Sequence, residues 1–414
     1  MNKLSFALFC LAVASQSNAK SNQDFDNDTA NKYEERLSGL EQQFESSSRQ
    51  VSLGGRLQID FNGFNGAYNA DNGGDFGAEL FPRRARLSVD GERTDLEYKM
   101  ILEFAEDTIE ILLLRFEYVG FDDGPVIKFG KIREDISLDA LTSSKHMALI
   151  ERASVANTMS PYFRWGVSAN QYFPTTGLRY AFGIYKNDAF GANGKDTDGA
   201  LALAASGRLT WNLALDHEQL FHAGGWSSYR EFGDEQLNGA FARAEIREPN
   251  VRLVDYSAGG QLVRLDYLSQ HGFEAAWQNG PLLIQGEYAE RRISTSDTSS
   301  ELNRATYAGY YIQASYMLTG EHKFYSTSSA RFNQPKGVAN AWEIAVRASS
   351  MDATSDLQGT RAQSYTLGVS YYIDEDTKIM VNGIRSSVSG PGTLALVNTN
   401  TEGNAITARF HYDF

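Results

Sequence analysis

Residues 405–414 read AITARFHYDF and end the chain. In an extended strand, Phe410, Tyr412 and Phe414 would share one face, and the mostly polar residues between them would share the other. In a soluble protein this apolar face would lie exposed at a sheet edge. A closed membrane barrel would instead turn it towards lipid and turn the polar face towards the lumen. The rest of the sequence has to distinguish these two possibilities.

The first residues have the three parts of a secretory signal peptide. Lys3 supplies the positive charge, residues 4–14 form an apolar core, and residues 17–19 form a small-residue cleavage site. We therefore expect residues 1–19 to be removed on export. The only cysteine, Cys10, lies in this segment, so the mature protein would have no disulfide.

Residues 20–50 form a separate polar segment ahead of the main domain. Its apolar residues Tyr33, Leu37, Leu40 and Phe44 recur at steps of four, three and four, with charged residues between them. This spacing corresponds to two heptads of a coiled coil, which are only marginally stable alone. It predicts either a short helix that pairs with the same helix in sister subunits, or a plain amphipathic surface helix.

Residues 51–414 are predicted to form one all-β domain, a 16-stranded antiparallel transmembrane β-barrel. Apolar residues alternate with polar ones throughout, as in Leu96, Tyr98 and Met100, and no apolar stretch after the signal is long enough for a membrane helix. The predicted strands are 51–66, 80–93, 94–106, 109–121, 124–132, 162–173, 176–187, 198–213, 216–230, 268–279, 281–293, 304–319, 339–350, 361–374, 375–388 and 404–414.

Short turns alternate with mostly longer polar connections along this domain, and both termini lie on the short-turn side. This is the layout of an outer-membrane barrel, in which the last strand pairs with the strand near Val51 so that no edge stays open. The connection at about 320–338 is longer than the other turns on its side and breaks the alternation.

The chain is acidic, with a formal net charge of -14. Removal of the signal peptide takes away one positive charge, because Lys3 is its only charged side chain, and leaves -15. This charge argues against a nucleic-acid partner. It does not decide the selectivity of a pore, which depends on the few side chains at the narrowest point of the lumen.

The connection 133–161 is the candidate for a constriction. Apolar residues such as Leu138, Leu141 and Leu149 would be costly in a loop surrounded by water, so we expect it to pack against the inner wall of the barrel. A sixteen-stranded barrel is wide enough for an aqueous channel unless a segment folds into it. A loop folded inwards would narrow that channel.

Several side chains near this loop could bind an anion. In the second strand, alternation sends Arg84 and Arg86 to the lumen and leaves Arg83 near the rim, and arginine matches the oxygens of phosphate or carboxylate. The loop would add Ser143, Ser144, Lys145 and Arg152. The alternative is that these arginines pair with carboxylates of neighbouring strands and only stiffen the wall. Those carboxylates would be Asp90, Glu97, Glu103 and Glu117. The residues alone leave both interpretations open.

The sequence resembles the phosphate-selective porin O and P family of Gram-negative outer-membrane channels. The resembling segments are Leu53-Gly54-Gly55-Arg56-Leu57-Gln58, Arg83-Arg84-Ala85-Arg86-Leu87, Ile127-Lys128-Phe129-Gly130-Lys131, Ser143-Ser144 through Glu151-Arg152, Gly286-Glu287-Tyr288, Leu318-Thr319-Gly320-Glu321, and Ala341-Trp342-Glu343 with Arg347. The resemblance implies a homotrimer of sixteen-stranded barrels, in which anions pass along arginines and lysines to a constriction formed by the inward loop.

Matching the motifs one by one implies a set of site residues. They are Arg83, Arg84, Ser143, Ser144 and Arg152, with Arg56 as an entrance-side or wall member. One departure weakens the phosphate expectation. Family members with a strong phosphate preference are lysine-rich in the loop, whereas this chain has Ala140 and a single lysine, Lys145.

Other functions find little support in the sequence. Ser143 or Ser144 near His146 could suggest a hydrolase, but no spacing brings nucleophile and base together, and the histidines form no metal-ligand set. An adhesin would use the long connection 231–267, and a general diffusion porin for other small solutes is the main alternative. We expect no cofactor. The expected partners are small anions, the lipid bilayer with lipopolysaccharide, sister subunits, and the outer-membrane assembly machinery that recognises Phe414.

Overall fold

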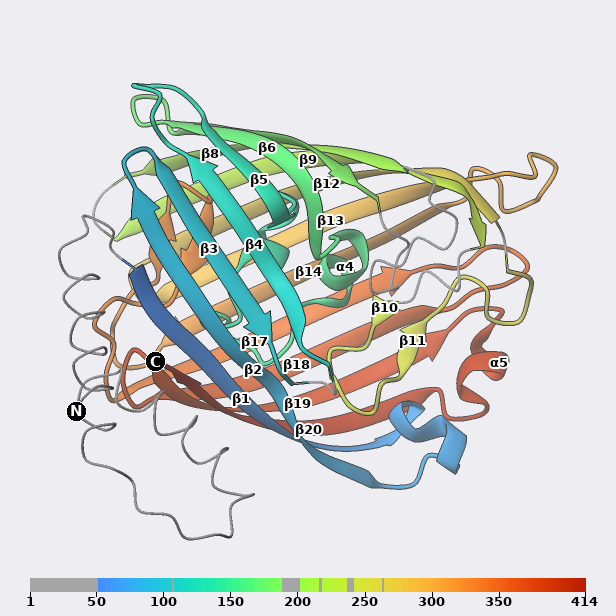
Figure 1. Ribbon diagram of the computed structural model, residues 1–414. Coiled ribbons are helices and arrows are strands. Elements are labelled where there is room, and N and C mark those ends of the chain that lie inside the picture. Colours follow the sequence, from blue (N-terminus) through green and yellow to red (C-terminus); the bar gives the residue numbers. More distant parts are fainter. Residues whose placement is uncertain (1–50, 106–107, 188–201, 216–217, 237–241, 263) are drawn as a thin grey trace, which may run out of the picture.

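A computed structural model describes residues 51–105, 108–187, 202–215, 218–236, 242–262 and 264–414 (Figure 1). Sixteen antiparallel strands form one closed barrel, which confirms the predicted fold. They are β1 (Val51–Gly66), β2 (Gly77–Arg93), β3 (Leu96–Glu103), β4 (Glu110–Tyr118), β5 (Val126–Arg133), β6 (Phe163–Phe173), β7 (Leu178–Lys186), β8 (Leu203–Ala214), β9 (Gln219–Gln236), β12 (Arg264–Asn279), β13 (Leu282–Thr295), β14 (Thr306–Met317), β17 (Ala341–Asp352), β18 (Arg361–Tyr372), β19 (Thr377–Ser389) and β20 (Glu402–Asp413). The predicted signal peptide and coiled-coil helix lie outside the described residues.

The barrel closes where β20 pairs with β1, from Arg56↔Asp413 to Gly66↔Gly403. Phe414 extends this ladder, because its backbone exchanges two hydrogen bonds with that of Gly55, at 2.9 and 3.1 Å. Gly55 lets the Phe414 ring lie directly over it, since a Cβ on it would lie 2.1 Å from Cζ of that ring.

The two faces of the last strand differ as predicted. Phe410, Tyr412 and Phe414 are 41%, 40% and 42% exposed on the outer surface, whereas Arg409 and His411 are each 1% exposed on the inner side. The same alternation runs through β12 to β20. The barrel is therefore apolar outside and polar inside, as a lipid-facing barrel requires.

The core of the protein lies inside the barrel. The connection between β5 and β6, residues 134–162, folds into the lumen and is called the inward loop below; it contains α3 (Leu138–Leu141) and α4 (Ser154–Met159). In Figure 1, α4 lies within the barrel, and it contacts β13, β14 and β17. Val155 and Met159 of α4 share a hydrophobic cluster with wall residues Tyr307 and Tyr311. The prediction of an inward-folded loop is confirmed.

A second segment also turns inwards. Residues 242–262, with β10 (Ala242–Arg243) and β11 (Arg252–Val254), contribute Ile246, Leu253 and Tyr256 to the cluster around α4. The connection predicted at 231–267 is thus shorter than expected, because β9 extends to Gln236, and much of it is folded inwards. It offers little of the exposed loop that an adhesin would use.

The irregular connection after β14 is explained by a third inward segment. Residues 318–340, called the inward turn below, contain a small sheet of β15 (Phe324–Ser326) and β16 (Arg331–Asn333). Its residues Tyr325, Ala330 and Phe332 share a buried cluster with Leu138 of the inward loop. This turn is long because it reaches the loop inside the barrel. The remaining short helices, η2 (Ala67–Asn72) and α5 (Thr393–Val397), lie in connections on the long-loop side.

Candidate constriction site

The inward loop is fixed along one side of the lumen by hydrogen bonds to its backbone carbonyls. Side chains of four neighbouring strands bind the carbonyls of Met147, Ala148, Ile150 and Glu151: Lys378 at 3.0 Å, Ser370 at 3.4 Å, Arg409 at 2.7 Å and Arg347 at 3.0 Å. A buried loop has no ladder of its own, so its carbonyls need such donors. This half of the loop therefore lies against β17 to β20.

The opposite wall, from β2 to β5, remains the more open side. Its ionic side chains Lys99 and Arg115 are each 31% exposed, whereas Arg208 and Arg230, on the wall that holds the start of the loop, are fully buried. Water can therefore reach part of the inner face of β3 and β4.

A β-bulge places two consecutive arginines on the inner side of β2. The register with β1 pairs Gln58 with Arg84 and Ile59 with Pro82, so Arg83 is an extra residue without a partner. A bulge of this kind re-aims side chains at the point where alternation breaks. Arg83 therefore binds Glu151 of the inward loop at 2.8 Å, and the expectation that it lies near the rim is wrong.

Four of the predicted site residues converge around Gln58 of β1. Arg56 donates to the hydroxyls of Ser143 and Ser144, at 3.4 and 2.8 Å. Arg84 donates to the amide oxygen of Gln58 at 2.5 Å, and the amide nitrogen of Gln58 lies 3.4 Å from the carbonyl oxygen of Ser144. The first two strands and the loop thus build one polar cluster from residues nearly ninety positions apart in sequence.

Most of the predicted cations are paired with carboxylates. Arg56 binds Asp413 at 2.8 Å, Arg86 binds Glu103 at 2.5 Å, and Lys145 lies 3.0 Å from Asp376 and 3.2 Å from Asp413. Of the carboxylates suggested from sequence, only Glu103 pairs with a predicted arginine. Asp90 binds Lys99, and Glu117 binds Arg115 and Lys128.

Arg84 and Arg152 are different, because neither forms an ion pair with a carboxylate within the described part of the chain. Arg152 donates to the carbonyls of Asp139 at 3.0 Å and Thr142 at 2.5 Å, so it shapes the loop itself. Arg84 is 4% exposed, and its Nε has no hydrogen-bond partner among the described residues. Among the predicted cations, Arg84 therefore has the charge that direct ion pairs and hydrogen bonds satisfy least.

Burial and neighbouring charged side chains shift the pKa values of two residues of the inward loop, Glu151 and His146. Burial disfavours a charged Glu151, but the guanidiniums of Arg83, Arg409 and Arg84 outweigh it and hold the pKa of that carboxyl well below its usual range. Burial and the neighbouring Lys378 and Arg331 lower the pKa of His146 to about 2.

The serine–histidine pair that a hydrolase would need is not formed by Ser143 or Ser144 with His146. The hydroxyls of Ser143 and Ser144 accept hydrogen bonds from Arg56, and Nδ1 of His146 has no hydrogen-bond partner among the described residues. A histidine with a pKa of about 2 is also a poor general base at neutral pH. Within the same residues, no group of three or more histidines, cysteines or carboxylates could hold a metal ion.

Several contributors were not predicted. Gln58, Glu151 and Arg409 take part in the network, and Arg331 of the inward turn donates to the carbonyl of Leu141. The motif around Arg56 contained Gln58, and the polar face of the last strand contained Arg409. No signal in the sequence connected the inward turn with the loop.

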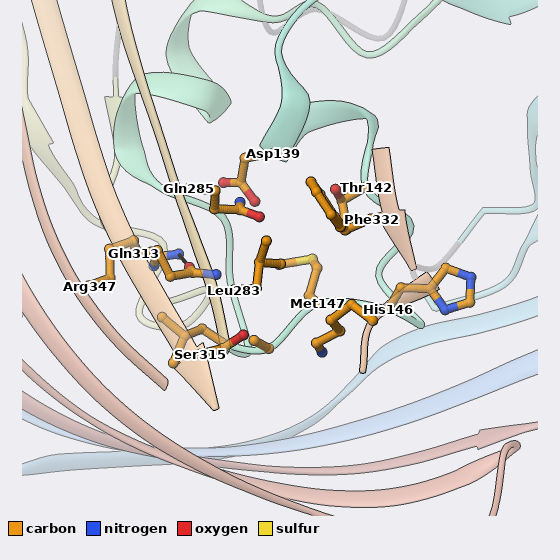
Figure 2. A pocket seen from close by; sticks show the side chains of 13 residues that line it. Asp139, Thr142, His146, Met147, Leu283, Gln285, Gln313, Ser315, Phe332 and Arg347 are labelled. Atoms are coloured by element: carbon orange, nitrogen blue, oxygen red, sulfur yellow. Dashed lines mark hydrogen bonds between the residues drawn. The ribbon is translucent and has the colours of Figure 1, made fainter. Parts of the chain in front are cut away.

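A polar pocket remains between the inward loop and the wall of β13, β14 and β17 (Figure 2). Asp139, His146 and Met147 line it from the loop, opposite Gln313 and Arg347. None of the eight predicted site residues lines this pocket, so it is distinct from the cluster around Gln58. In the described residues, no helix is long and apolar enough to cross a membrane.

A closed barrel with an apolar outer surface, a polar interior and a loop folded into its lumen defines a channel-forming membrane barrel. The chain belongs to the family of phosphate-selective porins O and P, whose sequence profile matches residues 51–414. The barrel and the family place it in a Gram-negative outer membrane. The relatives are porins rather than enzymes.

Individual relatives agree with this assignment. Porin O of Pseudomonas aeruginosa is 26% identical over 418 residues, covering 91% of this chain and 91% of that protein. OmpT of Vibrio cholerae, solved in a trimer form, aligns with a TM-score of 0.55 at 12% identity over 89% of this chain and 100% of that one. The outer membrane channel DcaP of Acinetobacter baumannii aligns with a TM-score of 0.54 at 13% identity, over 89% and 98% of the two chains. These two likenesses show the fold alone.

Proposed function

We propose that this porin is a passive diffusion channel that favours small anions, with phosphate-like oxyanions among them. The observation that carries the proposal is Arg84. Its buried guanidinium forms no direct ion pair with a carboxylate of the described residues, and the cations Arg83, Arg86 and Arg409 lie near it along with one carboxylate, that of Glu151. A buried charge without a counter-ion is costly. An anion at this point of the lumen would lower that cost, whereas a cation would raise it.

The surrounding donors suit an oxyanion. Ser143 and Ser144 supply neutral hydroxyls next to Arg56, and arginine presents a planar fork of N–H groups that matches carboxylate or phosphate oxygens. A permeating anion could exchange its water shell for these donors. In this proposal Arg56, Arg84, Ser143 and Ser144 bind the solute. Arg83, Arg86 and Lys145 add to the local field, and Arg152 shapes the loop.

Because most of the predicted cations are paired with carboxylates, we expect only a modest preference for anions. Asp413, Glu151 and Glu103 neutralise three of the predicted cations, and the inward loop has a single lysine, Lys145. The second candidate is therefore a general diffusion porin with a weak anion preference. Strict phosphate selectivity is not part of the proposal.

We further propose the assembly and export route expected from the sequence. The chain would be exported by the signal peptide of residues 1–19, inserted by the assembly machinery through Phe414, and would form a homotrimer in contact with lipid and lipopolysaccharide. The helix in residues 20–50 would assist trimer formation. The trimer form in which OmpT was solved supports the proposed trimer by analogy.

Planar-bilayer recording tests the channel directly. In a salt gradient, the purified protein should give a reversal potential on the anion side, and added phosphate should reduce the chloride current. A cation-selective reversal potential would overturn the anion proposal. Chloride current unaffected by phosphate would remove phosphate from it and favour the general diffusion porin.

A further inference from the structure

The outer surface of β12, β13 and β14 changes from apolar to polar towards the long-loop side. These strands are neighbours in the barrel wall (Figure 1). Phe273, Tyr288 and Tyr310 are paired in register across them, and all three are exposed on the outer surface. The next outward-facing residues towards the long loops are His271 and Glu290, which are also paired in register. The apolar band of the outer surface therefore ends here.

Two exposed arginines lie beyond this boundary. Arg292 of β13 is flanked in register by Ser269 of β12 and Thr306 of β14. Arg304 lies next to it, because its backbone N–H donates to the carbonyl of Ile293 at 3.0 Å. Neither guanidinium forms an ion pair or hydrogen bond with any described residue. Arg292, Arg304, Ser269 and Thr306 are called the outer patch below.

The nearest carboxylate of the same strand does not neutralise Arg292. Glu290 precedes Arg292 by two residues on the same face of β13. Its Oε2 accepts a hydrogen bond of 3.4 Å from the hydroxyl of Tyr288, which lies on its other side along the strand. Glu290 is thus bound to the aromatic row, and the outer patch keeps its positive charge.

The outer patch lies at the height expected for the membrane surface. Arg292 follows Leu282, the first residue of β13 on the short-turn side, by ten residues. With a rise of about 3.3 Å per residue and a tilt of about 40°, ten residues advance about 25 Å along the barrel axis, which equals the height of the apolar band of such barrels. The long loops of outer-membrane barrels are extracellular. The patch therefore lies at the level of the head groups of the outer leaflet.

We infer that the outer patch binds a phosphate group of lipopolysaccharide in the outer leaflet. The planar donor forks of Arg292 and Arg304 match phosphate oxygens, and the hydroxyls of Ser269 and Thr306 add neutral donors. The acyl chains of the same lipid lie against the exposed aromatic row below the patch. A free anion has no apolar part for this row, so the surface fits a phosphate that is anchored to lipid.

The outer patch is separate from the lumen. Gln270 and Arg291 alternate with its residues along β12 and β13, and both are buried on the inner side of the barrel. Changes in the patch therefore leave the luminal charges in place. The inference rests on the proposed contact with lipopolysaccharide, whereas it is independent of the proposed anion preference.

The test measures binding of purified lipopolysaccharide to the full-length protein in detergent. The double variant Arg292→Gln with Arg304→Gln removes both charges, and the double variant with lysine at both positions keeps them. Arg385→Gln is the matched control, because Arg385 is also exposed on the outer surface but is paired with Glu402 at 2.8 Å. The heat-dependent gel shift of folded barrels verifies that each variant has folded.

We expect about tenfold weaker binding in the double glutamine variant, because charged hydrogen bonds to phosphate are lost. The double lysine variant should retain most of the affinity, and Arg385→Gln should lose less than about twofold, since its charge is already paired. With lipid A from which both phosphates have been removed, the wild type and the double glutamine variant should bind equally. Inorganic phosphate should not displace lipopolysaccharide from the wild type.

An equal loss in Arg385→Gln, or a loss that persists with the dephosphorylated lipid, would overturn the inference. Displacement by inorganic phosphate would assign the patch to free anions and overturn the lipid as its partner. A wild-type protein that binds no lipopolysaccharide would overturn the inference together with the proposed lipid contact. The anion preference is measured separately by the reversal potential, so its failure is distinguishable from these outcomes.

Discussion

Arg409 of β20 binds Asp60 of β1 with two hydrogen bonds of 2.7 Å, across the seam where the last strand meets the first. The two residues face each other in the strand register, and both side chains are almost completely buried. Arg409 also holds the inward loop, through the carbonyl of Ile150 at 2.7 Å and the carboxylate of Glu151 at 3.0 Å. One side chain therefore connects barrel closure with the placement of the loop.

Replacement of Arg409 should destabilise the barrel strongly. Arg409→Gln leaves Asp60 buried with its charge uncompensated, and breaking a buried pair in this way costs about 3–5 kcal/mol. Arg385→Gln is a matched control, since Arg385 and Glu402 form a pair between β19 and β20 that is mostly exposed. An exposed pair contributes about 0–1 kcal/mol. Urea unfolding in detergent measures both, and equal losses would contradict the assigned role.

Replacement of Arg84 should reduce anion preference without disturbing the fold. Arg84→Ala removes a guanidinium that has no carboxylate partner among the described residues, so we expect a two- to fivefold lower anion-to-cation permeability ratio, about 0.4–1 kcal/mol of screened interaction. The comparison is the double variant Arg86→Gln with Glu103→Gln, because it removes a neutral pair and should change the ratio less. The reversal potential in a salt gradient reports both. An unchanged value in Arg84→Ala would remove Arg84 from the mechanism.

Arg152→Ala should act through the loop as well as through charge. Arg152 donates to the carbonyls of Asp139 and Thr142, so its removal leaves two buried acceptors without their donor. Each unsatisfied acceptor costs about 1–3 kcal/mol. We expect lower anion preference together with noisier currents and faster proteolysis of the loop, while the trimer persists on native gels. A change in selectivity with quiet currents would assign Arg152 to charge alone.

A side chain at Gly55 should displace the ring of Phe414. In Gly55→Ala, the new Cβ would meet the Phe414 ring, which has to move, and overpacking of this kind costs about 1–3 kcal/mol. Gly383→Ala in β19 is the control, because no atom lies within 4 Å of the position that its new Cβ would take. The yield of folded barrel on gels should fall for the first variant and stay unchanged for the second. Equal yields would show that the final ring is not needed for closure.

His146 should not make the channel sensitive to pH between about 8 and 5. His146 has a pKa of about 2, so it stays neutral in this range. Glu151 has a depressed pKa, so its contribution to stability is fully present above the unfolded value of about 4.3 and is lost as pH falls towards its folded pKa. Below about pH 4 the loop anchor weakens, and Glu151→Gln should abolish this acid response. A titration of conductance centred near pH 6.5 that disappears in His146→Gln would contradict the neutral His146.

Much of the fold follows directly from the order of residues. A period of two, as in Leu96, Tyr98 and Met100, predicts strands, and the alternation of short turns with long connections predicts a closed barrel that ends at Phe414. These signals are local, so they can be recognised without knowing any contact. The loop 134–162 was also recognisable, because its apolar residues needed a surface to cover them.

The site depended on features that are not local. The bulge at Arg83 breaks the period that alternation assumes, and the only residue near it that indicates a bulge is Pro82, a residue type that sheets accept at bulges and edges. The pairing of Arg56 with Asp413 joins residues at opposite ends of the chain, and it exists only because the barrel closes. The sequence therefore suggested which cations face the lumen, but it could not show which of them are neutralised.

The sequence by itself determined a sixteen-stranded barrel, its apolar exterior and an inward loop, because strand periodicity and connection length are properties of neighbouring residues. Only the tertiary structure decided that Arg84 lacks a carboxylate partner among the described residues, and that the inward turn reaches the loop through Arg331. These depend on distances of a few ångströms between segments far apart in the chain, and the free energy of a buried charge depends on those distances.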